Sequence, residues 1–341
     1  MIVSELFSKL LDSQGYILAD GATGTNLFNV GLESGEAPEI WNKDFPEKIK
    51  DLYRQSIIAG SDLFLTNSFG GNASRLALHG ASDEVYNLSK LSAQLGLEVK
   101  AEFERDLIMA GSIGPSGDLM APLGELSFSR AVEIFKEQIR GLVDGGVDLV
   151  WIETMSAIDE FKAAVEAASL VGISWIGTMS FDTSGRTMMG IKSSDFVDEV
   201  ENLPNAPLAY GANCGVGASD LLRTILGFVN AGASLPLVAK GNAGIPKFID
   251  GKIHYDGSPE LMARYAKMSL GCGAKIIGGC CGTTPEHLVA MKFALQDCEK
   301  PDRPSLSDIQ RDIGSFSSDS DGTDTKVSSK RSRRSRRNGC C

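Results

Sequence analysis

The sequence predicts an α/β protein with one (β/α)8 TIM-barrel domain and a disordered C-terminal tail. Eight short β-rich segments alternate with amphipathic helical segments along most of the 341 residues. The β-rich segments are apolar on both faces, as in a parallel sheet covered by helices. Polar and ligand-type residues follow these segments, and a barrel gathers all such positions at one mouth. A doubly wound open sheet is the competing arrangement.

The individual elements follow in order along the chain. The predicted strands are residues 16–20, 62–67, 107–113, 147–153, 174–181, 207–213, 236–241 and 274–279. The predicted helices are residues 46–60, 82–105, 127–145, 157–171, 194–202, 218–232, 258–271 and 285–297. Several of these helices begin with Ser or Pro and end at Gly, which is the usual chemistry of helix start and stop.

Length and composition favour one domain with an extension. An apolar content of 43% in a chain of this length is enough for one large core, so residues 1–300 are predicted to form the barrel. The alternating pattern ends near residue 301, and residues 301–341 are an extension and a basic tail. Residues 315–341 are rich in Ser, Asp, Gly, Lys and Arg and are predicted to be disordered.

Charge and targeting signals narrow the functional class. Residues 326–341 hold seven of the 33 basic residues and none of the 44 acidic ones, so the barrel itself is acidic and is not expected to bind nucleic acid. No apolar run is long enough to span a bilayer. Residues 1–11 do not resemble a secretory signal, because Glu5 and Lys9 interrupt them. We therefore expect a cytoplasmic protein with no membrane partner.

The cysteines predict a metal site. Seven cysteines without regular spacing do not indicate a disulfide framework. Cys280 and Cys281 follow the eighth predicted strand and Cys214 follows the sixth, so three thiolates can meet at one rim of the barrel. Three thiolates with one open position are typical of catalytic zinc. Core packing, or a redox disulfide for the adjacent pair, are the alternatives, whereas Cys272 and Cys298 fall on helices and are expected to pack.

Zinc with sulfur ligands suits a thiol substrate. The metal can bind a substrate thiol as its thiolate, because coordination offsets the cost of removing a proton with an unperturbed pKa of about 8.5. The cysteine pattern therefore predicts an enzyme that makes a thiolate nucleophile at neutral pH.

Short segments at the ends of seven predicted strands resemble the homocysteine S-methyltransferase family. The similarity extends over about residues 15–297, and among family members the chain is most similar to standalone bacterial betaine–homocysteine enzymes. The segments that carry it are residues 20–25 (DGATGT), 65–70 (LTNSFG), 111–117 (GSIGPSG), 152–154 (IET), 211–215 (GANCG), 241–244 (GNAG) and 278–287 (GGCCGTTPEH). The family is a zinc-dependent (β/α)8 barrel, in agreement with the residue pattern.

The resemblance also implies roles for individual residues. Cys214, Cys280 and Cys281 correspond to the zinc ligands, and Asn242 corresponds to an asparagine that can fill the fourth zinc position until the substrate thiol displaces it. From the residue pattern alone, Asn242 could equally be a turn former. Beyond the zinc-activated substrate thiolate, no catalytic group is expected.

The same resemblance predicts how the amino acid is held. Glu153 would receive the ammonium group of homocysteine. Asp20 would position the amino-acid end of the substrate with the backbone amides of Gly21, Ala22 and Thr23, which would serve the carboxylate. Asp20 alone could be a turn cap, whereas Glu153 at the end of a buried strand has few structural explanations, because an unpaired buried carboxylate is costly.

The methyl donor is expected to be a small onium compound. The chain has no room for the cobalamin and folate domains of methionine synthases. Glycine betaine, yielding dimethylglycine, is the predicted donor, and the sulfonium compounds S-methylmethionine and dimethylsulfoniopropionate are alternatives. Aromatic faces stabilise such cations, and the candidates are Trp41, Phe69, Trp151 and Tyr255. Animal betaine enzymes have aromatic residues where this chain has Gly70 and Thr154.

Two other functions compete. Lys240, near the end of the seventh predicted strand, could form a Schiff base in an aldolase-type barrel. The basic tail could instead make the protein an adaptor for RNA or an acidic surface. The predicted partners of the enzyme are homocysteine and the methyl donor, and a homo-oligomer is compatible with the fold.

Overall fold

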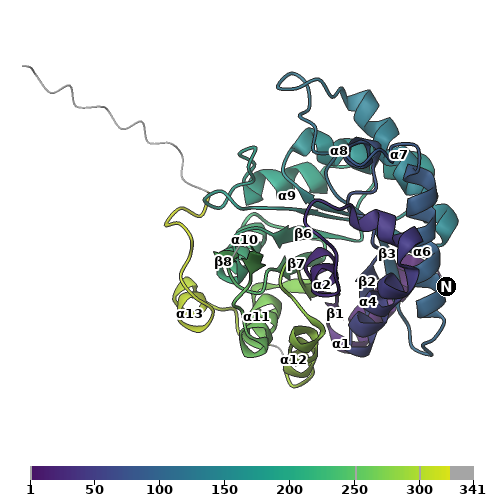
Figure 1. Ribbon diagram of the computed structural model, residues 1–341. Coiled ribbons are helices and arrows are strands. Elements are labelled where there is room, and N and C mark those ends of the chain that lie inside the picture. The colour runs from purple at the N-terminus through teal and green to yellow at the C-terminus, as the bar shows by residue number, and fades with distance from the viewer. Residues whose placement is uncertain (1, 250–251, 299–300, 323–341) are drawn as a thin grey trace, which may run out of the picture.

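The computed structural model describes residues 2–249, 252–298 and 301–322. Eight parallel strands form one sheet in the order β1-β10-β7-β6-β5-β4-β3-β2 (Figure 1). Their bounds are β1 Ile17–Leu18, β2 Leu63–Leu65, β3 Ile108–Ile113, β4 Leu149–Met155, β5 Trp175–Met179, β6 Ala209–Cys214, β7 Leu237–Gly241 and β10 Ala274–Gly279. Ala19 pairs in parallel with Leu63, and the Asp62 N–H donates to the Leu18 carbonyl at 2.7 Å. These contacts join the first strand to the second, so the predicted (β/α)8 barrel is confirmed.

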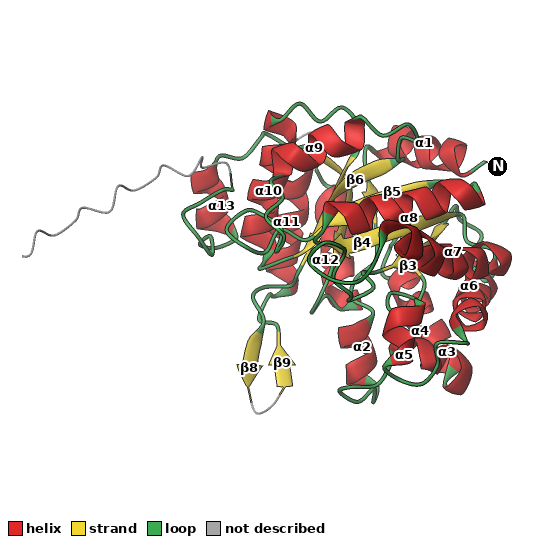
Figure 2. Ribbon diagram, turned by 90° about the horizontal axis from the view of Figure 1, so that it is seen from above, coloured by secondary structure: helices red, strands yellow, loops and turns green. Residues whose placement is uncertain are grey.

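The eight predicted helices are all present outside the strands (Figure 2). They are α4 Pro46–Ile58, α6 Val85–Lys100, α7 Phe128–Gly145, α8 Ile158–Val171, α9 Ser193–Glu201, α10 Ala218–Asn230, α11 Pro259–Cys272 and α12 Pro285–Gln296. Helix α7 shows why the sequence signals worked. The Ser127 side chain accepts the Arg130 N–H at its start, and Gly146 ends it with a φ of 102° that favours glycine.

The barrel interior is a core of its own, closed at the amino ends of the strands by helix α1, Val3–Gln14. Leu6, Phe7 and Leu10 of this helix pack with buried strand residues that include Leu63 and Trp151. The amino end of the barrel is therefore filled with apolar side chains, and polar groups lie at the opposite end.

Several short elements were not predicted. They are α2 Gly24–Asn29, η1 Pro38–Ile40, α3 Trp41–Asp44, α5 Ala73–Ala77, the hairpin strands β8 Lys247–Ile249 and β9 Lys252–His254, and α13 Leu306–Asp312. The hairpin lies between β7 and α11 and projects from the body of the barrel (Figure 2). It delivers Tyr255, the residue after β9, to the cysteine loop described below.

The prediction of disorder from residue 315 onward is wrong for residues 315–322. Helix α13 packs on α10 and α11, and the segment after it continues along α10. The Ser317 N–H donates to Asp220 Oδ2 at 3.0 Å, and Arg223 Nη1 donates to the Ser318 carbonyl at 2.8 Å. Composition concealed this contact because backbone groups and a buried ion pair provide part of it. The basic tail predicted at 326–341 lies outside the described residues.

None of the described helices is both long enough and apolar enough to cross a membrane.

Candidate functional site

The three predicted metal ligands lie together at the carboxyl ends of two strands, β6 and β10, that flank β7 in the sheet. Cys214 ends β6, and Cys280 and Cys281 follow β10. Their sulfur atoms all lie within 4.8 Å of one another, and Cys214 Sγ is 3.9 Å from Cys281 Sγ. Tetrahedral zinc with Zn–S bonds of about 2.3 Å would place sulfurs about 3.8 Å apart. The spacing and the soft sulfur donors therefore fit a metal such as zinc.

Strand β7, which lies between β6 and β10, holds the two cysteine loops. The Cys280 N–H donates to the Gly241 carbonyl at 2.6 Å. Asn242 accepts the Cys281 N–H on Oδ1 at 3.1 Å and donates from Nδ2 to the Gly215 carbonyl at 2.8 Å. Both ends of this amide thus tie the cysteine loops together. Oδ1 keeps a second lone pair, so service of Asn242 as a fourth metal ligand stays a prediction.

The cluster has one thiol that ionises readily. Hydrogen bonds from Cys214 and Cys280 lower the pKa of Cys281, and the Tyr255 hydroxyl also donates to its sulfur. The same interactions raise the pKa of Cys214. The first proton therefore leaves Cys281, and binding of a divalent cation would favour loss of the others.

Glu153, on β4, is a buried carboxylate beside this cluster. Its side chain accepts a hydrogen bond from Ser112 Oγ, and Asn213 Nδ2 lies 3.4 Å from Oε2. Burial raises the pKa of Glu153 to about 7, although the nearby Lys240 opposes the shift. A substrate cation bound here would stabilise the ionised carboxylate. Sequence reasoning missed both Ser112 and Asn213, and the only signal was their position near strand ends.

Asp20 is paired with Lys240 inside the barrel mouth. Lys240 Nζ lies 3.1 Å from Asp20 Oδ1 and donates to the Gly21 carbonyl at 3.0 Å, while Asp20 Oδ2 accepts the Leu65 N–H at 2.8 Å. Burial raises the pKa of Asp20, and Lys240 counteracts that effect. A ligand that contacts the Asp20 carboxylate would therefore meet one that is already paired with Lys240.

The environment of Lys240 argues against a Schiff base. Burial by itself lowers its pKa, but Asp20, Cys280 and Glu153 together raise the pKa above its ordinary value. An amine must be neutral to attack a carbonyl carbon. This lysine is held as an ammonium group, so the aldolase alternative finds no nucleophile here.

One of the backbone amides predicted to bind the substrate carboxylate, at residues 21–23, already donates a hydrogen bond within the protein. The Ala22 N–H donates to the Thr283 carbonyl at 3.2 Å. A Cβ at Gly21 would lie 2.8 Å from that same oxygen, so the close approach requires glycine. Binding of a substrate carboxylate by Gly21, Ala22 and Thr23 stays a prediction.

The four aromatic candidates lie in different surroundings. Trp151 is buried and donates from Nε1 to Thr178 Oγ1 at 3.0 Å. Trp41 packs on Phe45, with Lys48 Nζ 4.5 Å from its ring centroid. Phe69 lies against Gly114, where a Cβ would be 2.5 Å from its ring. Among the four, Tyr255 is the one that contacts a cysteine of the cluster.

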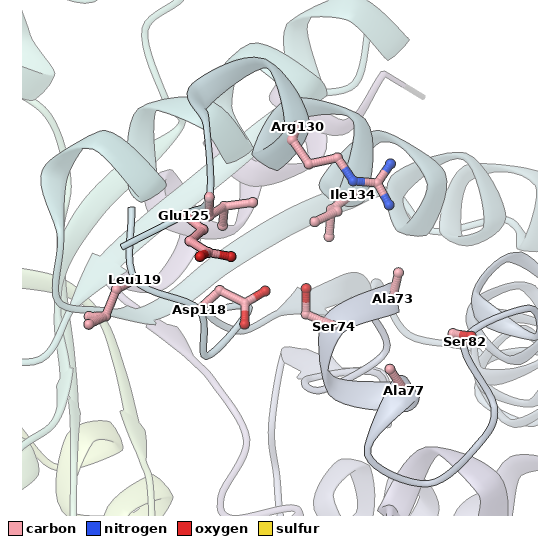
Figure 3. Close-up of a pocket in the computed structure, with 10 residues that line it drawn as sticks. Ala73, Ser74, Ala77, Ser82, Asp118, Leu119, Glu125, Arg130 and Ile134 are labelled. Atoms are coloured by element: carbon pink, nitrogen blue, oxygen red, sulfur yellow. The ribbon is translucent and has the colours of Figure 1, made fainter. Parts of the chain in front are cut away.

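A cavity of about 490 Å³ lies elsewhere, between α5, the loop after β3 and the start of α7. Asp118, Glu125, Ser74 and Arg130 are among its lining residues (Figure 3). None of the residues predicted for the metal or amino-acid site lines it, so this cavity is separate from the cysteine cluster.

Comparison with known proteins shows the family of the chain. The family model for homocysteine S-methyltransferase matches residues 17–295. The chain belongs to the homocysteine S-methyltransferase family. Two curated relatives are methionine synthases, from Mycobacterium tuberculosis (strain ATCC 25618 / H37Rv) and Mycobacterium leprae (strain TN). Each is 29% identical, over 89% and 84% of this chain. The chain spans only about a quarter of their length, at 27% and 25%.

Solved structures share the fold over almost their whole length. The metallated form of the homocysteine methyltransferase MmuM from Escherichia coli matches with a TM-score of 0.71 at 24% identity, covering 84% of this chain and 99% of that one. Its oxidized form matches with a TM-score of 0.67 at 25% identity and the same coverage.

Proposed function

We propose that this protein is a zinc-dependent homocysteine S-methyltransferase that forms methionine. The observation that carries the proposal is the cluster of Cys214, Cys280 and Cys281 beside the buried carboxylate of Glu153. Zinc held by three thiolates would supply Lewis acidity that keeps a bound thiol ionised at neutral pH. The chain's own groups then bind and orient the rest of homocysteine.

Glu153 is the proposed partner of the substrate ammonium group. It is nine-tenths buried, and within the described part of the chain it hydrogen-bonds with the Ser112 hydroxyl and the Asn213 amide. An ammonium group would supply the charge that this carboxylate lacks at close range. Asp20, paired with Lys240, and the amides of Gly21 to Thr23 would position the carboxyl end of the amino acid.

Methyl transfer itself needs no further catalytic side chain. The homocysteine sulfur donates an electron pair to the methyl carbon, and the bond from that carbon to the donor heteroatom breaks with its electrons leaving on the heteroatom. The thiol proton is released to solvent before the transfer. Alignment of the two reactants is the contribution asked of the protein.

Glycine betaine is the proposed donor, and dimethylglycine the second product. Support comes from the resemblance of the sequence motifs to betaine enzymes and from the aromatic side chain of Tyr255 beside Cys281, because an aromatic face stabilises a quaternary ammonium group. A sulfonium donor is the second candidate. It is favoured by Gly70 and Thr154, which stand where animal betaine enzymes have aromatic residues.

Metal analysis with a donor screen tests the proposal. Purified protein should contain about one zinc per chain and convert homocysteine to methionine with betaine or a sulfonium compound, without cobalamin or folate. Absence of methionine with every donor would overturn it. Zinc with turnover from a sulfonium but not from betaine would reject betaine and retain the reaction.

A further inference from the structure

Asn213 touches several parts of the site. Its side chain is fully buried. Oδ1 accepts the Thr154 N–H at 2.8 Å, and Nδ2 donates to Thr154 Oγ1 at 2.7 Å. The same Nδ2 lies 3.4 Å from Glu153 Oε2 and 3.9 Å from Cys280 Sγ. One amide therefore contacts the proposed ammonium site and a proposed metal ligand.

Thr154 explains why the amide is oriented in this way. Its φ is 60°, in the left-handed region that β-branched residues avoid. Two hydrogen bonds from a single side chain, one to its N–H and one to its hydroxyl, hold it there. An amide supplies both an acceptor and a donor, whereas a carboxylate or an aliphatic side chain does not.

The remaining proton on Nδ2 then has a fixed direction. With the first proton on Thr154 Oγ1, the second points to the region between Glu153 Oε2 and Cys280 Sγ. No solvent reaches the fully buried amide to replace it. The separation between the carboxylate and the sulfur is thus set through Asn213.

We propose that Asn213 is a positioning residue that fixes the Glu153 carboxylate relative to Cys280, and that it does so by clamping Thr154 in its left-handed conformation. The inference rests on the proposed function, because homocysteine would have to reach Glu153 with its ammonium group and the metal with its sulfur at the same time. A fixed spacing lets both contacts form without further ordering of the protein.

The test compares four proteins: wild type, Asn213→Ala, Thr154→Gly and the double variant. Asn213→Ala should raise the KM for homocysteine roughly 10-fold or more, as expected when a buried polar group loses its partner. It should also weaken zinc binding by about 10-fold, measured by competition with a chelator. Its melting temperature should fall, because Thr154 loses both hydrogen bonds.

The double variant separates strain from positioning. Glycine adopts a φ of 60° freely, so adding Thr154→Gly to Asn213→Ala should recover part of the lost melting temperature. The KM for homocysteine and the zinc affinity should stay impaired, because the shared N–H is still missing. A merely structural role for Asn213 would instead restore all three together.

Asn42→Ala is the matched control. Asn42 is also fully buried, and its Nδ2 donates to the Asn67 carbonyl at 2.9 Å. Its loss should lower the melting temperature without changing zinc affinity. Unchanged KM and zinc affinity in Asn213→Ala would overturn the inference, and failure of Thr154→Gly to recover stability would overturn the clamp. Wild-type protein inactive with every donor would instead defeat the proposed function, while zinc affinity and melting temperature would still decide the role of Asn213.

Discussion

Three sulfur atoms within 4.8 Å of one another cannot all ionise without a cation between them. Cys280→Ala removes one ligand and leaves two, which is too few for a tight zinc site. We expect this variant to lose both bound zinc and methyl transfer, with metal content measured on the purified protein. Cys272→Ala is the control, because Cys272 is buried on α11 and is no member of the cluster. Full zinc content in Cys280→Ala would show that the zinc is bound at another site.

Replacing Glu153 with glutamine keeps the shape and removes the charge. If this carboxylate receives the substrate ammonium, Glu153→Gln should weaken homocysteine binding by about 1.5 to 3 kcal/mol, the cost of a lost charge-assisted hydrogen bond. Steady-state kinetics should show the change mainly in the KM for homocysteine, with zinc content preserved. An unaltered KM would rule out the ammonium contact.

At the level of single residues, the sequence predicted which cysteines and which carboxylate belong to the candidate site. It did not predict the hydrogen bonds that orient these side chains. Cysteines and a carboxylate next to strand ends are visible in the sequence because their chemistry is specific. The role of Asn213 is not visible, since its partners Thr154 and Cys280 are 59 and 67 residues away. The left-handed φ of Thr154 is equally hidden, because no glycine marks it.

At the level of elements, the eight strands and their helices were predictable because each carries a local apolar pattern with start and stop residues. Other elements were not predicted, because each is short or lies outside the repeating strand–helix unit. Among them are helix α1, the hairpin of β8 and β9, and helix α13. The segment after α13 was misjudged because its attachment depends on Asp220 and Arg223 of α10, which form a buried ion pair at 2.8 Å. Composition does not reveal a partner that lies about a hundred residues away.

Arg223 therefore offers a test of the C-terminal attachment. It pairs with Asp220, donates to the Ser318 carbonyl, and lies 4.4 Å from the centroid of the Phe316 ring. Arg223→Ala leaves the buried Asp220 carboxylate without its cation and should lower the free energy of unfolding by about 3 to 5 kcal/mol. Denaturant unfolding measures this, and limited proteolysis should show earlier cleavage near residue 318. A loss below 1 kcal/mol would mean the attachment contributes little to stability.

A second test at this level concerns the loop after β3. Glu160 on α8 accepts the Ser116 N–H at 2.8 Å and also the Ser116 hydroxyl, and burial raises its pKa above the ordinary value. The folded protein therefore binds this proton more tightly than the unfolded chain does. The stabilisation from Glu160 is complete below the ordinary glutamate pKa and declines as the pH rises through the raised pKa.

Glu160→Gln removes that titration and keeps an acceptor oxygen for Ser116. The variant's stability should decline less than that of the wild type as the pH rises from 4 to 8, in melting curves recorded across that range. Glu133→Gln is a suitable comparison, because Glu133 is exposed and its pKa is lowered by its hydrogen bond with Lys136. Identical pH profiles for wild type and Glu160→Gln would refute the role assigned to burial.

At the level of the whole molecule, the acidic barrel presents one polar mouth, and the proposed reaction needs two substrates bound there together. The proposal assigns the homocysteine half to the cysteines and Glu153. The donor half is less defined. Trp41 contacts Lys48, Trp151 lies in the core and Phe69 lies against Gly114, and of the four candidates Tyr255 is the one that contacts the cysteine cluster. One aromatic face binds a quaternary ammonium less tightly than a cage of several.

The donor can be assigned by competition. A sulfonium compound is intrinsically a better methyl donor than betaine, so detectable turnover with one does not identify the natural substrate, and kcat/KM must be compared on one zinc-loaded preparation. We expect betaine to yield dimethylglycine and methionine in equal amounts. Tyr255→Phe keeps the aromatic face but removes the hydroxyl from Cys281, whereas Tyr255→Leu removes both. If the ring binds the onium group, Tyr255→Leu should raise the donor KM by about 3- to 30-fold beyond Tyr255→Phe, and equal values in the two variants would place the donor away from this residue.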